Sequence, residues 1–499
     1  MRFKKLGSAL LLTVLFSCSK NDVQFFVNEY PASFKEVGSI DIGDVGAAEI
    51  SAYDEITKRL FVVNNGTTNK IDVIDFSDPT NMKLIYSINI SAYGAVNSVA
   101  AHDGKLAAAI EAINKQDAGR VVVYNTSTYS EIKAITVGAL PDMITFSPDG
   151  KWILTANEGE PNTTYTNDPV GSVSIISVGG NYDVTNLDFG GFASQQAALT
   201  AKGLRVFGVG ANFAKDMEPE YIAVAPDSKT AWVTLQENNA IAKINLASKT
   251  ITDIFPLGFK DYNTDANAMD LSDKDGTVAF AKAQVKGIYM PDAIAVLPSG
   301  NIPYLFTANE GDAREYTALT EAKRIKDIVL DPTAFPNAAT LKQEAQLGRL
   351  NITSTLGDID GNGDYDGLYS FGARSFSVWN GNTGALVFDS KNELDNKCLQ
   401  AGVYDDTRSD DKGAEPEGIT IGIVGKKTIA FVGMERTDAV AIYDISDPTK
   451  PVYLQLLKTG DAPEGILFIA ADKSPTKQSL LVASSENDGV IKVYMPNKL

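Results

Sequence analysis

Acidic residues recur at two fixed places in a phrase that the sequence repeats along its length. The longest copy, Pro141–Glu160, contains an acid after a proline, an apolar stretch, Ser-Pro-Asp-Gly, a second apolar stretch and Asn-Glu-Gly-Glu. At the first place the repeats carry Glu49, Asp142, Glu220, Asp292, Glu417 and Glu464, with Asn97 in the second repeat. At the second place they carry Glu111, Glu158, Glu237, Glu310, Glu435 and Glu486, with Asn64 in the first repeat. Carboxylates that lie close together raise one another's pKa, so hard cations, arginines or shared protons must neutralise them.

The ligand types indicate which cation would bind. Oxygen ligands with no sulfur and almost no imidazole favour calcium, with magnesium as the second choice, over zinc or copper. His102 is the sole histidine and lies in a turn-like Ala-His-Asp-Gly sequence, which argues against haem ligation and histidine acid/base catalysis. No nucleotide cofactor is expected either. Arg314, Arg374 and Arg436 stand beside the acidic motifs and can neutralise some of them. The alternative is structural, because acids and glycines at strand ends also cap turns by accepting backbone N–H bonds.

The sharpest local motif is Asp-Ile-Asp-Gly-Asn-Gly-Asp-Tyr-Asp, in which oxygen side chains occupy alternate positions. Its predicted metal ligands are Asp358, Asp360, Asn362, Asp364 and Asp366. Oxygen side chains with glycines between them wrap a chain around calcium in an EF-hand loop. Tyr369 replaces the glutamate expected at the twelfth position, so Asp366 or a distant acid must complete the shell. The segment Asp270–Gly276 is a weaker echo, with which a plain acidic turn is equally consistent.

Short strands are the elements that must position these acids. Each repeat contains four short strands with alternating or continuous apolar residues, separated by turn residues. Four-stranded units of roughly 40–45 residues are typical of propeller blades. Seven repeat starts therefore predict an all-β fold, a seven-bladed β-propeller. The seventh repeat has only three strands, and we expect Phe34–Ile42 to pair with it and close the ring. A pair of β-sandwich domains is the alternative fold, which the repeated phrase disfavours.

Blade geometry then brings the two sets of acids together. The first strand of a blade is innermost and the second runs antiparallel to it, so the start of one and the end of the other share a face. The ring of acids predicted at this mouth of the channel consists of Asp142, Glu158, Glu220, Glu237, Asp292, Glu310, Glu417, Glu435, Glu464 and Glu486.

The N-terminal residues are predicted to lie outside the propeller. Arg2, Lys4 and Lys5 precede a short apolar run, Ser8–Phe16, which indicates a signal peptide too short to span a membrane. The predicted organisation is a signal peptide at residues 1–17, a lipidated tether at 18–33 and one propeller at 34–499, with insertions at 190–218, 259–290 and 316–369.

The sequence Leu-Phe-Ser-Cys that ends at Cys18 resembles a bacterial lipobox. This resemblance implies cleavage before Cys18, lipidation of its sulfur and membrane contact only through the lipid. An ordinary secretory signal is the alternative. The next four residues, Ser-Lys-Asn-Asp, loosely resemble the surface export tag of the Bacteroides group. We therefore expect an exported lipoprotein in the outer membrane or on the cell surface of a Gram-negative bacterium.

Charge and cysteine usage exclude other classes. The chain has 63 acidic and 44 basic residues and a formal net charge of −19, a surface that repels nucleic acid and anionic headgroups and attracts cations. No nucleic-acid partner is expected. Cys398 is the one thiol left after lipidation of Cys18, which excludes an intrachain disulfide. Cys398 lies in a polar run, Lys391–Gln400, and is interpreted as a bystander rather than a nucleophile.

Long phrases of the chain resemble the choice-of-anchor I domain family. The match extends from about Asp41 to Pro496 and includes LPDMITFSPDG, TANEGEP, MEPEYIAVAPDSKTAWVTLQENNA, LFTANEGDAREY and DIDGNGDYDGLYSFGARSFSVW. That family includes mesenchyme-specific cell-surface glycoproteins of biomineralising animals, and some bacterial relatives carry an alkaline phosphatase label. The resemblance implies a propeller fold, an extracellular setting and variable surface anchoring.

Two functions are consistent with these observations. The first is a surface protein that binds calcium and, through the cations, holds a small anionic ligand or mineral at its acidic channel face. The second is a metal-dependent phosphoester hydrolase of the alkaline phosphatase or phytase type, in which clustered cations bind phosphate and activate water. Its candidate catalytic residues are Glu310, Arg314, Arg374 and Arg436, the arginines holding phosphate oxygens. The sequence contains no recognisable nucleophile–base pair that would support catalysis, and it leaves the ligand and the oligomeric state open.

Overall fold

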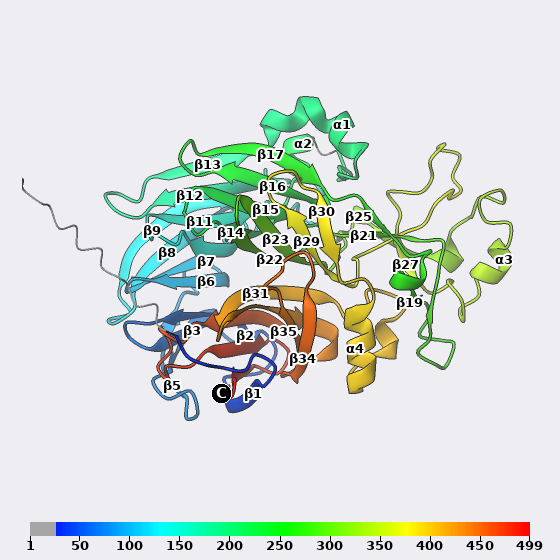
Figure 1. Cartoon of the computed structure of the whole chain (residues 1–499). Coiled ribbons are helices and arrows are strands. Elements are labelled where there is room, and N and C mark those ends of the chain that lie inside the picture. The colour runs from blue at the N-terminus through cyan, green and yellow to red at the C-terminus, as the bar shows by residue number, and fades with distance from the viewer. Residues whose placement is uncertain (1–25, 211) are drawn as a thin grey trace, which may run out of the picture.

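Short antiparallel strands make up most of the regular structure. The computed structural model describes residues 26–210 and 212–499, and this part of the chain contains seven four-stranded sheets (Figure 1). The all-β prediction is confirmed. The chain traverses six of the sheets from their first strand to their fourth before it enters the next, so each of these sheets is an antiparallel meander.

The bounds of these strands follow the repeats of the sequence. The first three sheets contain β2 (Ala47–Asp54), β3 (Arg59–Asn64), β4 (Lys70–Asp75) and β5 (Lys83–Asn89); β6 (Val96–His102), β7 (Lys105–Ile110), β8 (Ala118–Asn125) and β9 (Glu131–Ala139); and β10 (Pro141–Phe146), β11 (Trp152–Asn157), β12 (Ser172–Ser177) and β13 (Val184–Asp188). The fourth and fifth contain β14 (Pro219–Val224), β15 (Thr230–Leu235), β16 (Ala240–Asn245) and β17 (Thr250–Pro256); and β22 (Ile294–Ser299), β23 (Ile302–Ala308), β29 (Phe376–Asn380) and β30 (Leu386–Asp389). The sixth contains β31 (Pro416–Val424), β32 (Lys427–Met434), β33 (Ala439–Asp444) and β34 (Val452–Lys458). The seventh contains β35 (Pro463–Ile469), β36 (Leu480–Ser485), β37 (Val490–Met495) and β1 (Lys35–Asp41).

Apolar residues of neighbouring sheets pack face to face. A separate hydrophobic cluster lies between each consecutive pair of sheets. A further cluster joins the last sheet to the first, where Leu480 and Ile491 pack with Leu60 and Val62. Each fully buried aliphatic side chain of this kind contributes roughly 1.5–3 kcal/mol. The first strands β2, β6, β10, β14, β22, β31 and β35 contact one another in this order, and β35 contacts β2.

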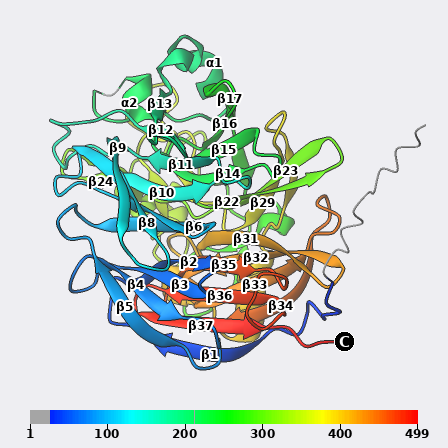
Figure 2. The same ribbon diagram turned by 90° about the vertical axis from the view of Figure 1, so that its left-hand side faces the viewer.

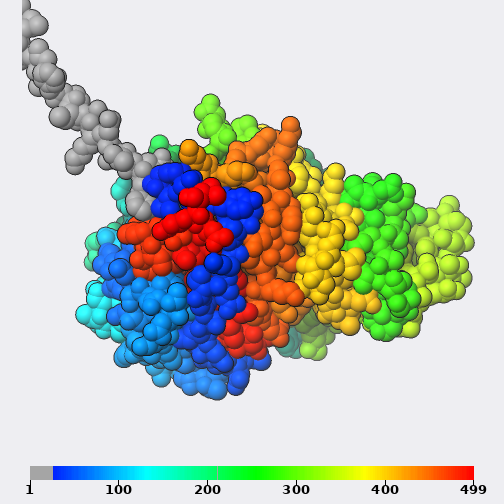
Figure 3. Space-filling view, turned by 60° about the horizontal axis from the view of Figure 1, so that its bottom comes forward, coloured from blue at the N-terminus to red at the C-terminus, as the bar shows by residue number. Residues whose placement is uncertain are grey.

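Strand β1 joins the two ends of the described chain. It pairs antiparallel with β37, from Lys35 opposite Met495 to Asp41 opposite Val490. The space-filling view shows the N-terminal and C-terminal strands side by side on the surface (Figure 3). Phe34, just before β1, is 2% exposed and packs edge-on against Phe431 of the sixth sheet at 5.4 Å between ring centroids. The structure thus places the predicted strand Phe34–Ile42 at the edge of the seventh sheet.

Two of the predicted insertions fold together as one lobe. Tyr262, Met269 and Val285 of the first segment share a hydrophobic cluster with Phe335 and Leu350 of the second, and the lobe extends to one side of the sheets (Figures 1 and 3). Its strands are β18 (Phe259–Asp261), β19 (Met269–Asp270), β20 (Phe280–Ala281), β21 (Lys286–Ile288), β24 (Glu315–Tyr316), β25 (Leu319–Thr320), β26 (Ala322–Arg324), β27 (Asn351–Thr353) and β28 (Tyr369–Ser370).

Helices are few and short. The α-helices are α1 (Gln196–Thr200), α2 (Phe213–Asp216), α3 (Ala338–Leu341) and α4 (Glu393–Ala401), and the 3-10 helices are η1 (Gly190–Gln195), η2 (Asp265–Asn267), η3 (Ile325–Asp327), η4 (Asp406–Arg408) and η5 (Glu435–Thr437). Within residues 26–210 and 212–499, none of them has the length and apolar composition that a membrane-spanning helix needs. Cys398 of α4 is fully buried, and burial raises the pKa of its thiol to about 12, so it is a packing residue.

The position of Phe34 gives a test of how firmly the N-terminal segment is docked. We expect Phe34→Ala to lower the free energy of unfolding by about 3 kcal/mol, because it removes a buried aromatic ring from between two sheets. Phe26→Ala is the matched control, since Phe26 is 49% exposed. Urea unfolding followed by tryptophan fluorescence measures both. Equal effects of the two substitutions would show that β1 contributes little to the stability of the fold.

Candidate cation-binding site

A recurring β-bulge at the start of the first strand orients the acids of the first-strand set. In β10, Pro141 pairs with Asn157 and Ile144 pairs with Thr155, which leaves two residues opposite one. The same shift occurs at the start of β14 and β31. A bulge of this kind bends the strand locally and redirects a side chain. The acids that occupy these bulges are Asp142, Glu220 and Glu417.

The backbone just before several of these acids is strained. Leu140, Met290, Glu415 and Ala462 have φ angles of 48°, 43°, 52° and 56°, and each precedes a proline. A non-glycine residue in the left-handed region costs of order 1–3 kcal/mol. Packed surroundings must impose this conformation at four equivalent places, all at the same end of the sheets. Strain of this kind clusters at functional sites, which directs attention to this end.

Each of the three residues of the Asn-Glu-Gly phrase at the end of β11 has a different structural role. The Asn157 side chain is buried and donates hydrogen bonds to the Ser172 carbonyl and to the Ser174 Oγ, so it holds the sheet together. Gly159 has a φ of 73°, and a Cβ there would lie 2.7 Å from the Gly171 nitrogen. The turn therefore requires glycine, and Glu158 is the residue of the phrase that is left to face Asp142 and Glu220.

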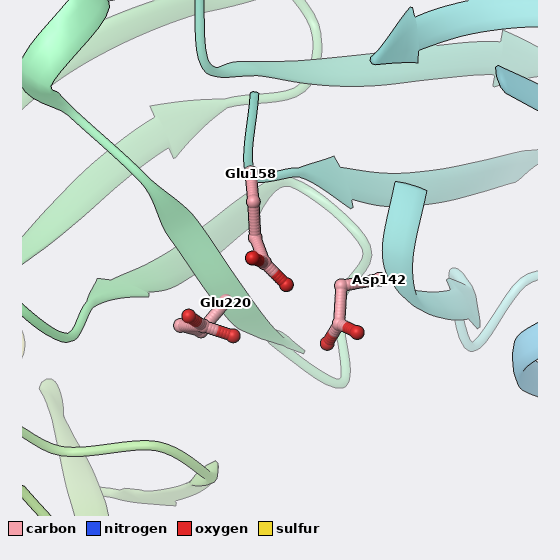
Figure 4. Close-up of side chains that lie close together, drawn as sticks. All are labelled: Asp142, Glu158 and Glu220. Atoms are coloured by element: carbon pink, nitrogen blue, oxygen red, sulfur yellow. The ribbon is translucent and has the colours of Figure 1, made fainter. Parts of the chain in front are cut away.

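Carboxylates from both sets converge at this end. Oxygen atoms of Asp142, Glu158 and Glu220 all lie within 4.8 Å of one another, and Figure 4 shows the three side chains pointing into one space. The same limit holds for Asp292, Glu310 and Glu417, and for Glu310, Glu415 and Glu435. We call these acids the acidic mouth: Asp142, Glu158 and Glu220, with the neighbouring Glu237 that belongs to none of these groups, form its Asp142 cluster, and Asp292, Glu310, Glu415, Glu417 and Glu435 form its Glu310 cluster.

The Asp142 cluster is strongly biased against full ionisation. Burial first, and then the charges of Asp142 and Glu160, raise the pKa of Glu158 well above its usual range. Burial, Glu158 and Glu237 do the same for Glu220. Burial raises the pKa of Asp142 to about 6 and that of Glu237 to about 8. Without protons or cations these groups would repel one another in a poorly solvated space.

The Glu310 cluster contains its own cation. The ammonium of Lys412 lies 2.8 Å from Glu310 Oε1, 3.1 Å from Glu415 Oε2 and 3.7 Å from Asp312 Oδ1. Gln236 donates a hydrogen bond of 2.9 Å to the other oxygen of Glu310. Burial acts in the opposite direction, but the charge of Lys412 lowers the pKa of Glu310 below its usual value. Glu310 is therefore an ionised and occupied carboxylate.

Three predicted acids lie around the first and last sheets. Burial, and then the charges of Glu49 and Glu486, raise the pKa of Glu464 well above its usual range. Burial and Glu486 raise the pKa of Glu49 to about 8. Among the described residues, Glu464, Glu49 and Glu486 belong to none of the groups within 4.8 Å. Glu464 nonetheless lines the same cavity as Asp142 and Asp292.

That cavity lies between the first strands. Its volume is about 310 Å³, and Asp142, Asp292 and Glu464 line it together with apolar residues of β2, β6, β10, β31 and β35. Figure 2 shows β10, β14, β22, β31, β35 and β2 succeeding one another around this region. The acidic mouth thus opens onto a space lined by first strands.

Two of the three predicted arginines, Arg374 and Arg314, use their donors inside the protein. Arg374 contacts none of the ring acids: it donates hydrogen bonds to the backbone carbonyls of Asp270, Ser409 and Asp411, so its predicted role there is corrected. Arg314 is buried and holds Asp216 at 2.8 Å and Glu218 at 2.7 Å. Its donors are thereby used inside the protein.

Arg436 is the partly exposed arginine of the three. Its side chain is 38% exposed and pairs with Glu435 at 2.9 Å, with Glu415 3.6 Å away. It therefore lies at the Glu310 cluster, as the sequence predicts, and adds a second positive charge to that side.

The sequence analysis did not identify several charged residues in or beside the acidic mouth. Glu218 and Glu415 stand before the prolines of their repeats, so the phrase Glu-Pro-Glu carried a signal for both. Burial raises the pKa of Glu218 well above its usual value despite the opposing charge of Arg314. Lys412 lies between sheets, in a segment without repeat character, and no sequence signal marks it.

The calcium-like loop at residues 358–366 is a separate site candidate. Asp358, Asp360 and Asp366 each offer an oxygen within 4.8 Å of the others, and Asp331 forms a second such group with Asp364 and Asp366. Asp331 is thus a distant acid brought to the loop by the lobe. Within the loop, Asp358 and Asp366 also accept hydrogen bonds from backbone N–H groups of the same loop, whereas in the weaker echo Asp270 accepts from Ser409 and Asp273 from Arg349, both distant in sequence.

Arg314 and Arg436 should differ sharply in how much they contribute to the free energy of unfolding. We expect Arg314→Ala to lower the free energy of unfolding by about 3–5 kcal/mol, because it leaves Asp216 and Glu218 buried without a counter-charge. Arg436→Ala, the control, should cost no more than about 1 kcal/mol, since its ion pair is partly solvated. Urea unfolding measures both free energies. A small effect of Arg314→Ala would contradict its assignment as an internal counter-charge.

Comparison with known proteins gives two curated relatives. The chain is 28% identical over 189 residues to gigasin-3a of Magallana gigas, covering 31% of this chain and 66% of that protein. It is 26% identical over 308 residues to the mesenchyme-specific cell surface glycoprotein of Strongylocentrotus purpuratus, covering 51% and 39%. The chain therefore spans less than two thirds of each relative.

Solved structures to which this chain is similar include hydrazine synthase of Kuenenia stuttgartiensis (12% identity, TM-score 0.47, 92% of this chain and 97% of that one). They also include the β-propeller domain of Cps50 (Swd1) of Myceliophteria thermophila (7% identity, TM-score 0.46, 93% and 100%). The family model for the choice-of-anchor I domain matches residues 49–448, which include every residue of the acidic mouth. The chain belongs to the choice-of-anchor I domain family.

Proposed function

We propose that this protein is a surface-anchored calcium-binding β-propeller that holds an anionic ligand or mineral at its acidic mouth through bound cations. The observation that carries the proposal is the convergence of buried carboxylates from different sheets within 4.8 Å of one another. Carboxylates in such numbers need a positive partner, and hard divalent cations are the partners that oxygen ligands select.

A seven-bladed closed ring is the architecture that we propose for the sheets. Hydrophobic clusters between all consecutive sheets, including the last and the first, support it. The pairing of β1 with β37 supports closure by the N-terminal strand. A ring of this kind gives the acids one common axis, which two separate sandwiches would not.

Calcium is the cation that the donor sets favour, with magnesium as the alternative. Calcium accepts six to eight oxygen ligands in irregular arrangements, whereas magnesium demands a near-ideal octahedron and keeps much of its water. The loop at residues 358–366 offers Asp358, Asp360, Asn362, Asp364 and Asp366, to which the lobe adds Asp331. Two kinds of calcium site, one in the lobe and one at the mouth, are therefore proposed.

An anionic ligand follows from incomplete neutralisation of the cation. A calcium ion held by protein carboxylates on one side keeps coordination positions for outside oxygens, such as those of phosphate, carbonate or a carboxylate. Family membership supports a surface setting for this binding. Cys18 and the rest of the predicted signal and lipobox lie outside the described residues, so lipid anchoring to an outer membrane remains a proposal from the sequence.

Binding is proposed in preference to phosphoester hydrolysis. The hydrolase hypothesis depended on Glu310, Arg314, Arg374 and Arg436 as catalytic groups. Arg314 and Arg374 use their donors on internal carboxylates and carbonyls, and Glu310 is paired with Lys412. Of the three arginines, Arg436 keeps a partly exposed guanidinium, which is too little for a phosphate clamp.

Calcium should stabilise the protein. We expect the melting temperature of the purified protein to rise by several degrees in calcium and to fall on addition of EDTA, because a ligand at 100 times its Kd stabilises the folded state by about 2.7 kcal/mol. Differential scanning calorimetry measures this, with magnesium and sodium at equal ionic strength as controls. An unchanged melting temperature across calcium, magnesium and EDTA would refute the proposed function.

The lobe site can be tested separately. We expect Asp360→Asn to weaken terbium or calcium binding by on the order of 10-fold or more, because it removes one charged ligand from the loop. Terbium luminescence sensitised by Tyr365, within the loop, measures occupancy there. Asp275→Asn is the matched control, since Asp275 is an exposed turn acid that accepts a bond from the Thr277 N–H. Equal affinity in both variants would contradict a metal site at residues 358–366.

A further inference from the structure

The acidic mouth is divided into two unequal halves, and we propose that its divalent cation binds in the Asp142 cluster, between Asp142, Glu158, Glu220 and Glu237, whereas Lys412 takes the place of a cation in the Glu310 cluster. This inference rests on the proposed function and specifies the ligands of the bound ion. It makes the mouth a site for one calcium ion, displaced to one side of the channel axis.

The first support is the lack of donors at the Asp142 cluster. Across residues 26–210 and 212–499, no backbone N–H and no cationic side chain donates a hydrogen bond to Asp142, Glu158 or Glu220 within normal distance. The charge of Lys115 acts on Asp142, but its ammonium pairs with Glu111 at 3.5 Å. Asp142 and Glu158 are hydrogen-bonded to each other through a shared proton, and the oxygens that face one another in Figure 4 have no other donor within the described chain, so an outside cation can replace that proton.

The second support is an independent one, the side chain of Glu237. It is 8% exposed, and its Oε2 is buried without a hydrogen-bond partner. The charge of Glu237 acts on Glu158 and Glu220, and also on Asp292, so the group lies near the Asp142 cluster but outside the set of oxygens within 4.8 Å of one another. A buried carboxylate oxygen without a partner destabilises the fold, because it has given up its hydrogen bonds to water and received none in return. A cation shared with the three neighbours removes that destabilisation, and it gives calcium a fourth carboxylate.

The Glu310 cluster supplies the contrast. Lys412 is 8% exposed and contacts both Glu310 and Glu415, while Gln236 donates to the second oxygen of Glu310. Arg436 adds another charge beside Glu435. A calcium ion between Asp292, Glu310 and Glu417 would have to bind next to these two cations, whose repulsion opposes it. Glu417 occupies the same kind of bulge as Asp142 and Glu220, and its Oε2 is likewise buried without a hydrogen-bond partner, so the difference between the halves comes from the charges of Lys412 and Arg436.

Isothermal titration with calcium chloride distinguishes the halves. The background is the full chain carrying Asp360→Asn, which weakens the lobe site and leaves the mouth intact. We expect Glu220→Gln to weaken calcium binding at the mouth by on the order of 100-fold, because it replaces a charged ligand with a neutral one. Glu417→Gln is the matched control: it makes the same change in the same bulge of another first strand, and we expect less than about 3-fold.

A second readout excludes misfolding as the cause. Without calcium, Glu220→Gln should melt at the same or a higher temperature than the background, because it removes one of several repelling charges. It should nevertheless lose the stabilisation by calcium that the background shows.

The outcomes separate the two proposals. If the background binds no calcium at the mouth, the proposed function there fails, and the inference fails with it. If the background binds calcium but Glu417→Gln abolishes binding and Glu220→Gln does not, the function stands and the division of the mouth is overturned. Equal loss in both variants would also overturn it, because the ion would then be shared across the channel.

Discussion

Repulsion between buried carboxylates is the constraint around which this molecule is built. Two unit charges 4.8 Å apart repel by about 3.5 kcal/mol at an effective dielectric constant of about 20, and the mouth contains many such pairs. The backbone adds strain to this repulsion, since Leu140, Met290, Glu415 and Ala462 are held in left-handed conformations beside the acids. A fold that maintains both costs must recover them from packing elsewhere and from positive charge at the mouth.

Packing between sheets supplies the rigidity. Each sheet shares one hydrophobic cluster with its predecessor and another with its successor, so no first strand can shift without disturbing two interfaces. Because the sheets are rigid, the bulges at the start of β10, β14 and β31 hold the acidic side chains in fixed directions. The acids are consequently presented by the most constrained part of the molecule, which is what a preorganised cation site requires, because the site need not be ordered when the ion arrives.

The repeats could be recognised in the sequence because the strands of each sheet mostly follow one another along the chain. Turn signals such as Ser-Pro-Asp-Gly and the spacing of apolar residues located the strands of β10 and β11, and the short last repeat pointed to Phe34–Ile42 as a partner of β37. The acids at the two strand ends followed from blade geometry. Arg374 was misplaced because adjacency in sequence to Glu-rich phrases does not determine which way a side chain points. The role of Lys412 could not be predicted, because its contacts with Glu310 and Glu415 depend on a loop between two sheets that is not part of the repeat pattern.

Differences between equivalent positions therefore come from the segments between strands rather than from the strands. Most repeats carry Asp or Glu at the start of the first strand and at the end of the second. By themselves, these repeated positions would place the acids symmetrically. The segment before β31 brings Lys412 to one side, and the segment after β23 brings Arg314 against Asp216 and Glu218, which lie just before β14, on another. Both cations are buried and paired, so neither leaves when an ion arrives. The repeated acids need positive charge to neutralise them. The segments between strands, which differ from one another, supply that charge to some of the acids from within the chain, and the remaining acids are left for an ion from solution.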